Sequence, residues 1–316
     1  MLDDHTTSSE MPILVIGAAG WDMVGKIKSK LIPHTSNPAQ IRHSFGGTAR
    51  NVAENLLRLG TPVTLMTVVG EDDTGDRLIR EMIDVGANVE AVLRSSDFPT
   101  GSYLAVVNEA GKLEYGLDDM RLLAELSPSY IHNQEHLFEQ ASMVFIDTNL
   151  SKESTRTIMS ISRRLKLPVC ADPTSQHLAG KLIPYLSRMY MVVPNFREAA
   201  FLCDRKSEPT TRREAINAAK CLVSNGVEIA IVTMDGAGVC YATSETSGYV
   251  PPVNTDIIDT TGAGDALTAA VLFGLLNEMP IDDAVRLGVA AESLTMAYRG
   301  AVFPDLSLER LYDQLH

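Results

Sequence analysis

Short apolar segments alternate with longer segments of helical periodicity along most of this 316-residue chain. Short apolar runs are typical of strands buried on both faces, and the segments between them are long enough for helices. The expected strands are 13–16, 62–69, 143–147, 168–172, 191–193 and 228–233, and the main expected helices are 75–85, 151–166, 176–187, 195–203, 211–225 and 266–276. This order predicts an α/β fold, with a mostly parallel sheet covered by helices on both faces.

One part of the chain departs from this alternation. Segments 102–108 and 112–116 flank a short turn that contains Gly111, which indicates a β-hairpin. Segments 21–32 and 40–44 also have an extended pattern, and none of the four has a helix beside it. We expect one domain over residues 1–316, with a small antiparallel lid formed by about residues 21–44 and 98–117.

The charge and the cysteine pattern exclude several classes of protein. The formal net charge is −13, so a large electropositive surface for nucleic acid or an anionic membrane is not expected. The longest apolar runs, 11–20 and 266–276, are too short to cross a bilayer. Cys170, Cys203, Cys221 and Cys240 are scattered, which predicts neither a disulfide framework nor a cysteine zinc site. A cytoplasmic protein that binds a small molecule fits these features best.

The strongest chemical motif is DTTGAGD at residues 259–265, directly before an apolar helix. Small residues at Gly262, Ala263 and Gly264 allow successive backbone N–H groups to converge at a helix N-terminus, where they can hold a phosphoryl group. Asp265 lies at the same helix end and could accept a proton from an attacking hydroxyl. The alternative is an ordinary helix start, since a carboxylate is stabilised there in any case.

A second motif, SFGGTARN, covers residues 44–51. Gly46 and Gly47 permit a close approach of the backbone to a ligand, and the Asn51 amide offers donors and acceptors to sugar hydroxyls. The alternative is a glycine turn before a helix that ends near Gly60. A third pattern, H-x-x-E-H at 132–136, matches an inverted zinc-peptidase motif, but its segment is short and polar, and the other histidines form no cluster.

Together, the first two motifs resemble the two signatures of the pfkB (ribokinase-like) carbohydrate kinase family, and the resemblance covers nearly the whole chain. Asp22 follows the first strand as the family's sugar-binding aspartate does, and residues 70–75 resemble its G-x-D-x-x-G turn. Residues 195–198 match its N-x-x-E motif, and residues 233–238 are similar to its nucleotide-binding turn. The resemblance implies ATP-dependent phosphorylation of a hydroxyl, with Mg²⁺.

The resemblance also implies a role for each matching residue. Asp265 would be the base, and Gly262, Ala263 and Gly264 the anion hole. The substrate would be held by Asp22, Gly46, Gly47 and Asn51, with Thr100, Tyr103 and Asn149 near its base. ATP and Mg²⁺ would be bound near Asn195, Glu198, Thr233, Asp235, Gly236 and Gly238. A monovalent cation, K⁺, would lie near Asp259, Thr261 and Gly300, although Asp259 could equally cap its own turn.

Within the family, residues 49–56 (ARNVAENL) are similar to the pseudouridine kinases, as are residues 100–103, 117–120, 147–150 and 172–175. This implies phosphorylation of the ribose 5′-hydroxyl of pseudouridine. The alternatives are another nucleoside, ribose or a keto-sugar acid as acceptor, and a non-catalytic nucleotide or sugar sensor. Strand 102–108 would leave unpaired edge groups, so we expect a homodimer joined through the lid.

Overall fold

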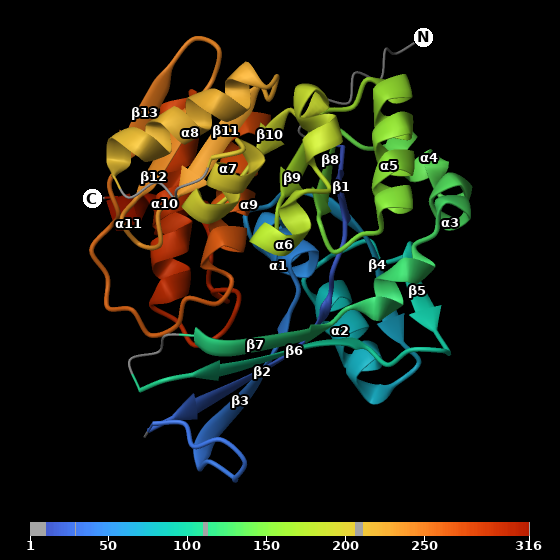
Figure 1. Cartoon of the computed structure of the whole chain (residues 1–316). Coiled ribbons are helices and arrows are strands. Elements are labelled where there is room, and N and C mark those ends of the chain that lie inside the picture. Colours follow the sequence, from blue (N-terminus) through green and yellow to red (C-terminus); the bar gives the residue numbers. More distant parts are fainter. Residues whose placement is uncertain (1–10, 29, 110–112, 206–210, 316) are drawn as a thin grey trace.

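The computed structural model describes residues 11–28, 30–109, 113–205 and 211–315. Its nine-stranded sheet has the order β13-β12-β11-β10-β9-β8-β1-β4-β5, and a separate four-stranded sheet has the order β3-β2-β6-β7 (Figure 1). The strands of the large sheet are β1 (Ile13–Ile16), β4 (Val63–Gly70), β5 (Val92–Ser95), β8 (Met143–Asp147), β9 (Val169–Asp172), β10 (Met191–Val192), β11 (Ile229–Thr233), β12 (Val239–Ala242) and β13 (Ser247–Val250). The pairs from β5 through β11 are parallel, and β12 and β13 add an antiparallel edge, which confirms the predicted α/β class.

Helices cover both faces of the large sheet. On one face lie α1 (Thr48–Arg58), α2 (Asp73–Asp84), α9 (Ala263–Leu276), α10 (Ile281–Met296) and α11 (Leu308–Leu315). On the other lie η1 (Arg121–Glu125), α3 (Pro128–Asn133), α4 (Glu135–Glu139), α5 (Lys152–Leu165), α6 (Gln176–Ala179), η2 (Ile183–Arg188), α7 (Phe196–Leu202) and α8 (Arg212–Ser224). In β1, Ile13 and Val15 enter the first core and Leu14 and Ile16 the second, as the two-residue repeat of a strand requires. This explains why the strand is apolar throughout.

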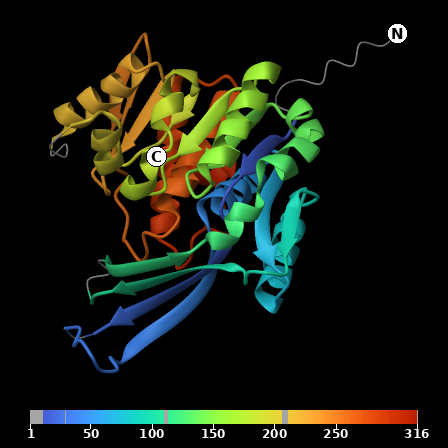
Figure 2. The same cartoon turned by 45° about the vertical axis from the view of Figure 1, so that its right-hand side comes forward.

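The smaller sheet, here called the lid, consists of β2 (Gly20–Ile27), β3 (Ala39–Gly46), β6 (Gly101–Val107) and β7 (Leu113–Asp119). It extends from one end of the large sheet (Figure 2). The hairpin of β6 and β7 is antiparallel, as predicted, while β2 and β6 run parallel. The turn proposed at residues 109–111 lies mostly outside the described residues.

Two expectations about local structure were wrong. The single helix expected over residues 176–187 is divided into α6 and the 3₁₀ helix η2. Pro184 cannot donate a backbone hydrogen bond and its ring obstructs a continuing α-helix, so the break lies before it. Cys203 and Cys221 are joined as a disulfide between the end of α7 and α8, with Cα atoms 6.3 Å apart, although their sequence spacing gives no sign of it. No helix among the described residues is long and apolar enough to span a membrane.

Candidate active site

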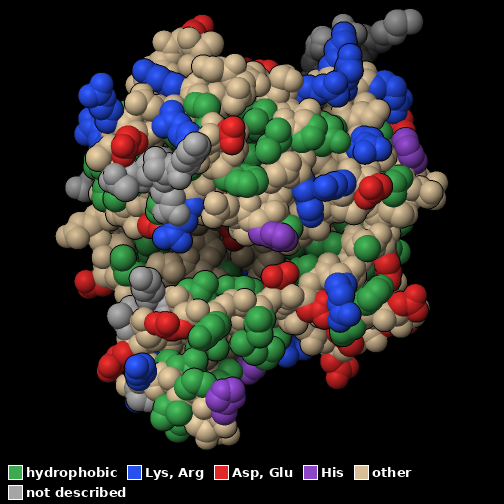
Figure 3. Space-filling model, viewed as in Figure 1, with side chains coloured by type: hydrophobic (Ala, Val, Ile, Leu, Met, Phe, Trp, Pro, Cys, Tyr) green, Lys and Arg blue, Asp and Glu red, His purple; other side chains and the backbone are tan. Residues whose placement is uncertain are grey.

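Acidic side chains meet where the parallel strands end and the lid begins. The carboxyl ends of neighbouring parallel strands lie at one edge of a sheet, so Asp147 at the end of β8 is next to Asp172 at the end of β9. The acidic side chains that interact electrostatically at this edge are Asp22, Asp147, Asp172, Glu198 and Asp265. The space-filling view is hollowed between the lid and the main body of the molecule (Figure 3). The candidate active site lies at this edge.

The glycine-rich loop before α9 has the geometry of an anion-binding site. Gly262 has a φ of 74° in the left-handed region, and a Cβ there would overlap the Ala301 carbonyl oxygen. Helix α9 begins at the next residue, Ala263. The backbone N–H groups of its first turn have no acceptor within the helix. A Cβ on Gly264 would meet no atom within 4 Å. Open space therefore lies over a helix N-terminus, as binding of a phosphoryl group requires.

The open space at Gly264 allows the phosphoryl-binding role of the loop to be tested by a substitution that the fold can accommodate. Gly264→Ala is expected to leave stability unchanged or raise it by up to about 1 kcal/mol, because alanine is a better helix former than glycine. The added methyl group would occupy the space for the phosphoryl group, so we expect a loss of kcat/KM for ATP of roughly 10²-fold, measured by ADP release.

Gly180→Ala is the matched control, since Gly180 has an α-helical φ of −58° and a Cβ there would make only ordinary contact with Phe201. Equal activity of the two variants would contradict the assignment of the loop.

Asp265 is held at the helix N-terminus by a neighbour from the other motif. Its Oδ2 accepts a hydrogen bond of 2.7 Å from Nδ2 of Asn51. Burial raises the pKa of Asp265 to about 7, the Asn51 bond lowers it, and the charges of Asp147 and Asp22 raise it further. A carboxylate with a pKa near neutrality is suited to accept a proton from a hydroxyl at physiological pH. The structure thus joins the two motifs, which are 214 residues apart in sequence.

The raised pKa predicts how activity depends on pH. Below pH 7, Asp265 is increasingly protonated and cannot accept a proton, so kcat/KM is expected to fall about tenfold per pH unit. Burial also raises the pKa of Asp22 to about 6, so the slope should steepen below that pH. A profile that stays flat between about pH 5.5 and 8 would contradict a base with this pKa.

Asp22 lies on the face of the lid that points toward the large sheet. It is 5% exposed, and it is paired with Ser44 on β3 and Tyr103 on β6. A Cβ on Gly46 would overlap the Asp22 carboxyl group, so this glycine makes room for the aspartate. Its neighbour Gly47 is the N-cap of α1, the helix that carries Asn51. The second motif therefore connects the lid strand that pairs with Asp22 to the helix that carries Asn51.

Two buried residues next to Asp22 and Asp265 lie in segments that matched the family, but neither was named as a site residue. Asp147 accepts backbone hydrogen bonds from Ala18 (2.6 Å), Ala49 (3.2 Å) and Asn149 (2.9 Å), and so fixes the loop after β1, the first turn of α1 and the turn after β8. Arg50 is 5% exposed, and its charge lowers the pKa of both Asp22 and Asp265. Two sequence signals point to Asp147: it ends an apolar strand, and it begins the matching segment 147–150.

The three residues expected near the base of the substrate lie in different environments. The Tyr103 side chain is half-buried beside Asp22, where burial and the aspartate raise its pKa. The Asn149 amide donates to Asp147 Oδ1 at 3.0 Å. The Thr100 hydroxyl donates to Asp72 at 2.7 Å and accepts from the Gly70 N–H, so it fixes the loop before β6 to α2. Of the three, Tyr103 shares the face of the lid that carries Asp22.

The residues expected to bind nucleotide cluster around the start of α7. Asn195 and Glu198 form a reciprocal capping box, and Glu198 is 5% exposed, with a pKa raised by burial. Thr233 pairs with Asn195, which brings the turn after β11 to this helix. That turn has positive φ at Asp235, Gly236 and Gly238. Glu292 of α10, which was not predicted, faces the same turn. Burial and the Asp235 charge raise its pKa to about 7.

Asp259 has partners for both carboxylate oxygens. Oδ1 accepts from the N–H and the hydroxyl of Thr261, as a turn cap does, and Oδ2 pairs with the Arg42 guanidinium at 2.5 Å. Arg42 belongs to β3, so the pair joins the lid to the loop before α9. Gly300 lies one residue from Ala301, whose carbonyl packs against Gly262.

The acidic edge is compatible with Mg²⁺ that arrives with a nucleotide. No group of three or more His, Cys, Asp or Glu side chains in the described ranges is arranged to hold a metal ion by itself. Mg²⁺ is usually bound through one or two carboxylates, water and substrate phosphates. Asp172 is a carboxyl group at this edge, and burial beside other carboxylates raises its pKa. Glu198 and Asp172 are the residues that fit this role. The H-x-x-E-H motif does not form one helical face, because His132 lies in α3, which ends at Asn133, and His136 lies in α4.

Comparison with known proteins places this chain in one family. The chain superposes on the structure of Arabidopsis thaliana ribokinase complexed with ribose and ATP with a TM-score of 0.82 at 19% identity, covering 96% of this chain and 98% of that one. The fold is therefore ribokinase-like. Residues 12–307 match the model of the pfkB family carbohydrate kinases, and the chain belongs to this family.

Two relatives act on nucleosides according to their names. The chain is 28% identical to the pseudouridine kinase of Escherichia coli (strain K12) over 297 residues, which covers 94% of each protein. It is 31% identical to the guanosine-inosine kinase of Exiguobacterium acetylicum over 307 residues, 92% of this chain and 96% of the relative. The chain is accordingly a sugar or nucleoside kinase of the pfkB family.

Proposed function

We propose that the protein phosphorylates the ribose 5′-hydroxyl of pseudouridine with ATP. The observation that carries this proposal is the juxtaposition of Asp265, the open helix N-terminus at Gly264 and the lid aspartate Asp22 at one edge of the sheet. The similarity to the E. coli pseudouridine kinase, together with the ARNVAENL sequence of α1, favours this acceptor. The guanosine-inosine kinase at 31% identity makes a purine nucleoside the second candidate.

In this proposal, each part of the site has one task. Asp22 accepts hydrogen bonds from the ribose hydroxyls and holds the sugar between lid and sheet. Asp265 accepts the proton of the 5′-hydroxyl as the hydroxyl oxygen attacks the γ-phosphorus and the bond from that phosphorus to the β–γ bridging oxygen breaks, which releases ADP. Asn51 keeps the carboxylate aimed at the attacking oxygen. The N–H groups at the start of α9 stabilise the charge on the transferred phosphoryl group. Bound Mg²⁺ would neutralise phosphate charge beside Glu198 and Asp172.

The acceptor is tested by kcat/KM with Mg-ATP for pseudouridine, uridine, guanosine, inosine, ribose and a keto-sugar acid, with ADP release as the readout. We expect pseudouridine to give the highest value. A higher value for a purine nucleoside or ribose would replace the proposed acceptor and leave the kinase assignment intact. No turnover with any acceptor, while ATP still binds, would support a nucleotide sensor instead.

We also propose that K⁺ activates the enzyme near Asp259, Thr261 and Gly300. Because Arg42 already pairs with Asp259, the cation would have to share or replace that guanidinium. K⁺ at constant ionic strength should raise kcat, and Asp259→Ala should remove the response. An unchanged rate would leave Asp259 as the cap of its turn and the partner of Arg42.

The outer face of the lid supports a homodimer. The strand register places Leu117 beside Leu104, and Tyr115 on the same face as Ile41, opposite the face of Asp22. These four side chains are 66%, 38%, 59% and 67% exposed. Hydrophobic side chains gather over the lid in Figure 3. An apolar sheet face of this kind is usually covered by a partner, and a second copy would offer the same surface by two-fold symmetry.

Leu104→Lys with Leu117→Lys is expected to weaken dimerisation by about 10²-fold or more, because two charges per subunit would be buried in the interface. Sedimentation velocity at micromolar concentration measures the change. Ile83→Lys, at an exposed isoleucine of α2, is the control and should dimerise normally. A wild-type monomer, or equal dimerisation of all variants, would exclude this interface.

A further inference from the structure

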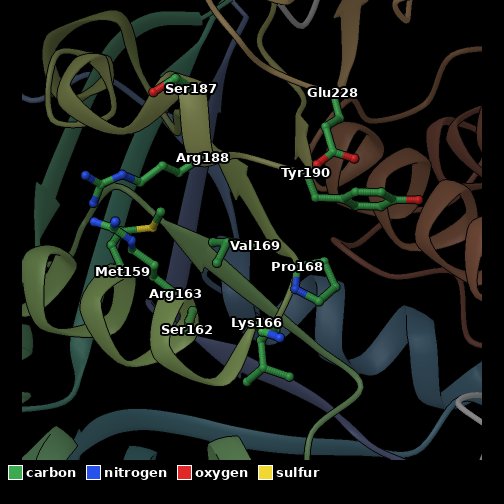
Figure 4. Close-up of a pocket in the computed structure, with 11 residues that line it drawn as sticks. Met159, Ser162, Arg163, Lys166, Pro168, Val169, Ser187, Arg188, Tyr190 and Glu228 are labelled. Carbon is green, nitrogen blue, oxygen red and sulfur yellow. The ribbon is translucent and has the colours of Figure 1, made fainter.

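A second cavity, of about 620 Å³, lies at the opposite end of the strands from the candidate active site. Its walls come from the C-terminal part of α5, the start of β9, the end of η2, and the residues just before β10 and β11 (Figure 4). Val169 lines the cavity, and Asp172, at the other end of the same strand, belongs to the active-site edge. The cavity is within the size range of small-molecule sites.

The cavity is electropositive on a chain whose net charge is −13. Arg163, Lys166 and Arg188 line it, against a single carboxylate, Glu228. No ion pair involving any of the three cations is found within the described ranges. In Figure 4, Arg163 and Arg188 extend toward one side of the cavity, and Glu228 and Tyr190 lie at the other. The lining thus has a cationic side and a side with an acceptor and an aromatic ring.

A buried hydroxyl gives an independent sign of a ligand. Ser162 is 1% exposed and lines the cavity, and its Oγ has no hydrogen-bond partner. Buried hydroxyls are normally satisfied, so the unpaired Ser162 hydroxyl is a donor that a ligand in the cavity could use. The dipole of α5 explains basic residues in its last turn, but it accounts neither for Arg188, which comes from η2, nor for Ser162.

We infer that this cavity is a second ligand site, which binds a phosphate monoester of a small hydroxylated molecule. Arg163 and Arg188 would hold the phosphate, since guanidinium groups bind phosphate in a planar, bidentate way, and Ser162 would donate its hydroxyl. Glu228 would accept from hydroxyls on the body of the ligand. The inference does not depend on the proposed acceptor, because it uses none of the residues of the active site.

The test is calorimetric titration of the whole protein with uridine 5′-monophosphate, glucose 6-phosphate, inorganic phosphate and succinate. We expect both phosphate esters to bind, and Arg163→Gln with Arg188→Gln to weaken binding roughly 30-fold or more, by the loss of two charge-assisted interactions. Arg164→Gln is the matched control, because the adjacent Arg164 pairs with Glu135 and does not line the cavity. It should bind as the wild type does.

Three results would overturn the inference: unchanged binding in the double variant, tighter binding of succinate than of the phosphate esters, or absence of binding in the wild type. KM for ATP must also stay within about twofold of wild type in the double variant, since a parallel change would show that the titrated site is the active site. If the double variant does not fold, as judged by its thermal transition, the single variants and Ser162→Ala should each weaken binding severalfold.

Discussion

Asp265→Asn is expected to lower kcat by about 10²–10⁴-fold, the usual contribution of a positioned general base. Asparagine has the shape of aspartate and can keep a hydrogen bond to Asn51, so the KM values for ATP and the acceptor should change little. Stability should not fall. The pKa of this carboxyl group is higher in the folded protein than in the unfolded chain, so its ionisation opposes folding from about pH 4 upward, in full above about pH 7, and the amide removes that penalty.

At pH 8 the thermal midpoint of Asp265→Asn should therefore equal or exceed that of the wild type, and the gain should shrink as the pH falls toward 4. Asp282→Asn is the control, because Asp282 pairs with Arg286 at the surface, away from the acidic edge. Activity of Asp265→Asn within a few-fold of the wild type would exclude Asp265 as the base.

Asp22→Ala should act mainly on binding of the acceptor. Burial raises the pKa of Asp22 to about 6, so the group is a carboxylate at pH 7.5. Burial of this charge is unfavourable, and hydrogen bonds from a ligand would offset that cost. Loss of two charge-assisted hydrogen bonds to sugar hydroxyls would raise KM for the acceptor by about 10²–10³-fold, with a smaller change in KM for ATP.

Asp118→Ala provides the matched control on the lid, since Asp118 pairs with Tyr103 on the neighbouring strand but is exposed. Its kinetics should be close to wild type. An acceptor KM that is the same for Asp22→Ala and Asp118→Ala would remove Asp22 from the substrate site.

The sequence was most informative where function depends on local backbone geometry. The loop at Gly262–Asp265 and the N-x-x-E motif of Asn195 and Glu198 depend on residues a few positions apart, and both motifs were recognised in the sequence. The break before Pro184 was also readable in principle, because proline disfavours a helix interior. It was missed because the apolar spacing on either side continues the helical pattern.

Other features depend on contacts between distant segments. The bond between Asn51 and Asp265, the pair of Arg42 with Asp259, and the joining of Cys203 to Cys221 have no signal within a short window of sequence. The same is true of Arg50. It lies within a recognised motif, but its effect is to lower the pKa values of Asp22 and Asp265, which are distant in sequence. These contacts appear only once the order of strands brings the segments together.

Transfer of the γ-phosphoryl group of ATP to a nucleoside 5′-hydroxyl is tested most directly by identifying the product. The protein is incubated with Mg-ATP and pseudouridine, and the mixture is followed by phosphorus NMR. We expect one phosphate monoester per ADP formed, with its phosphorus coupled to the two 5′ protons of the ribose. ADP accompanied only by inorganic phosphate, or a monoester at another hydroxyl, would contradict it.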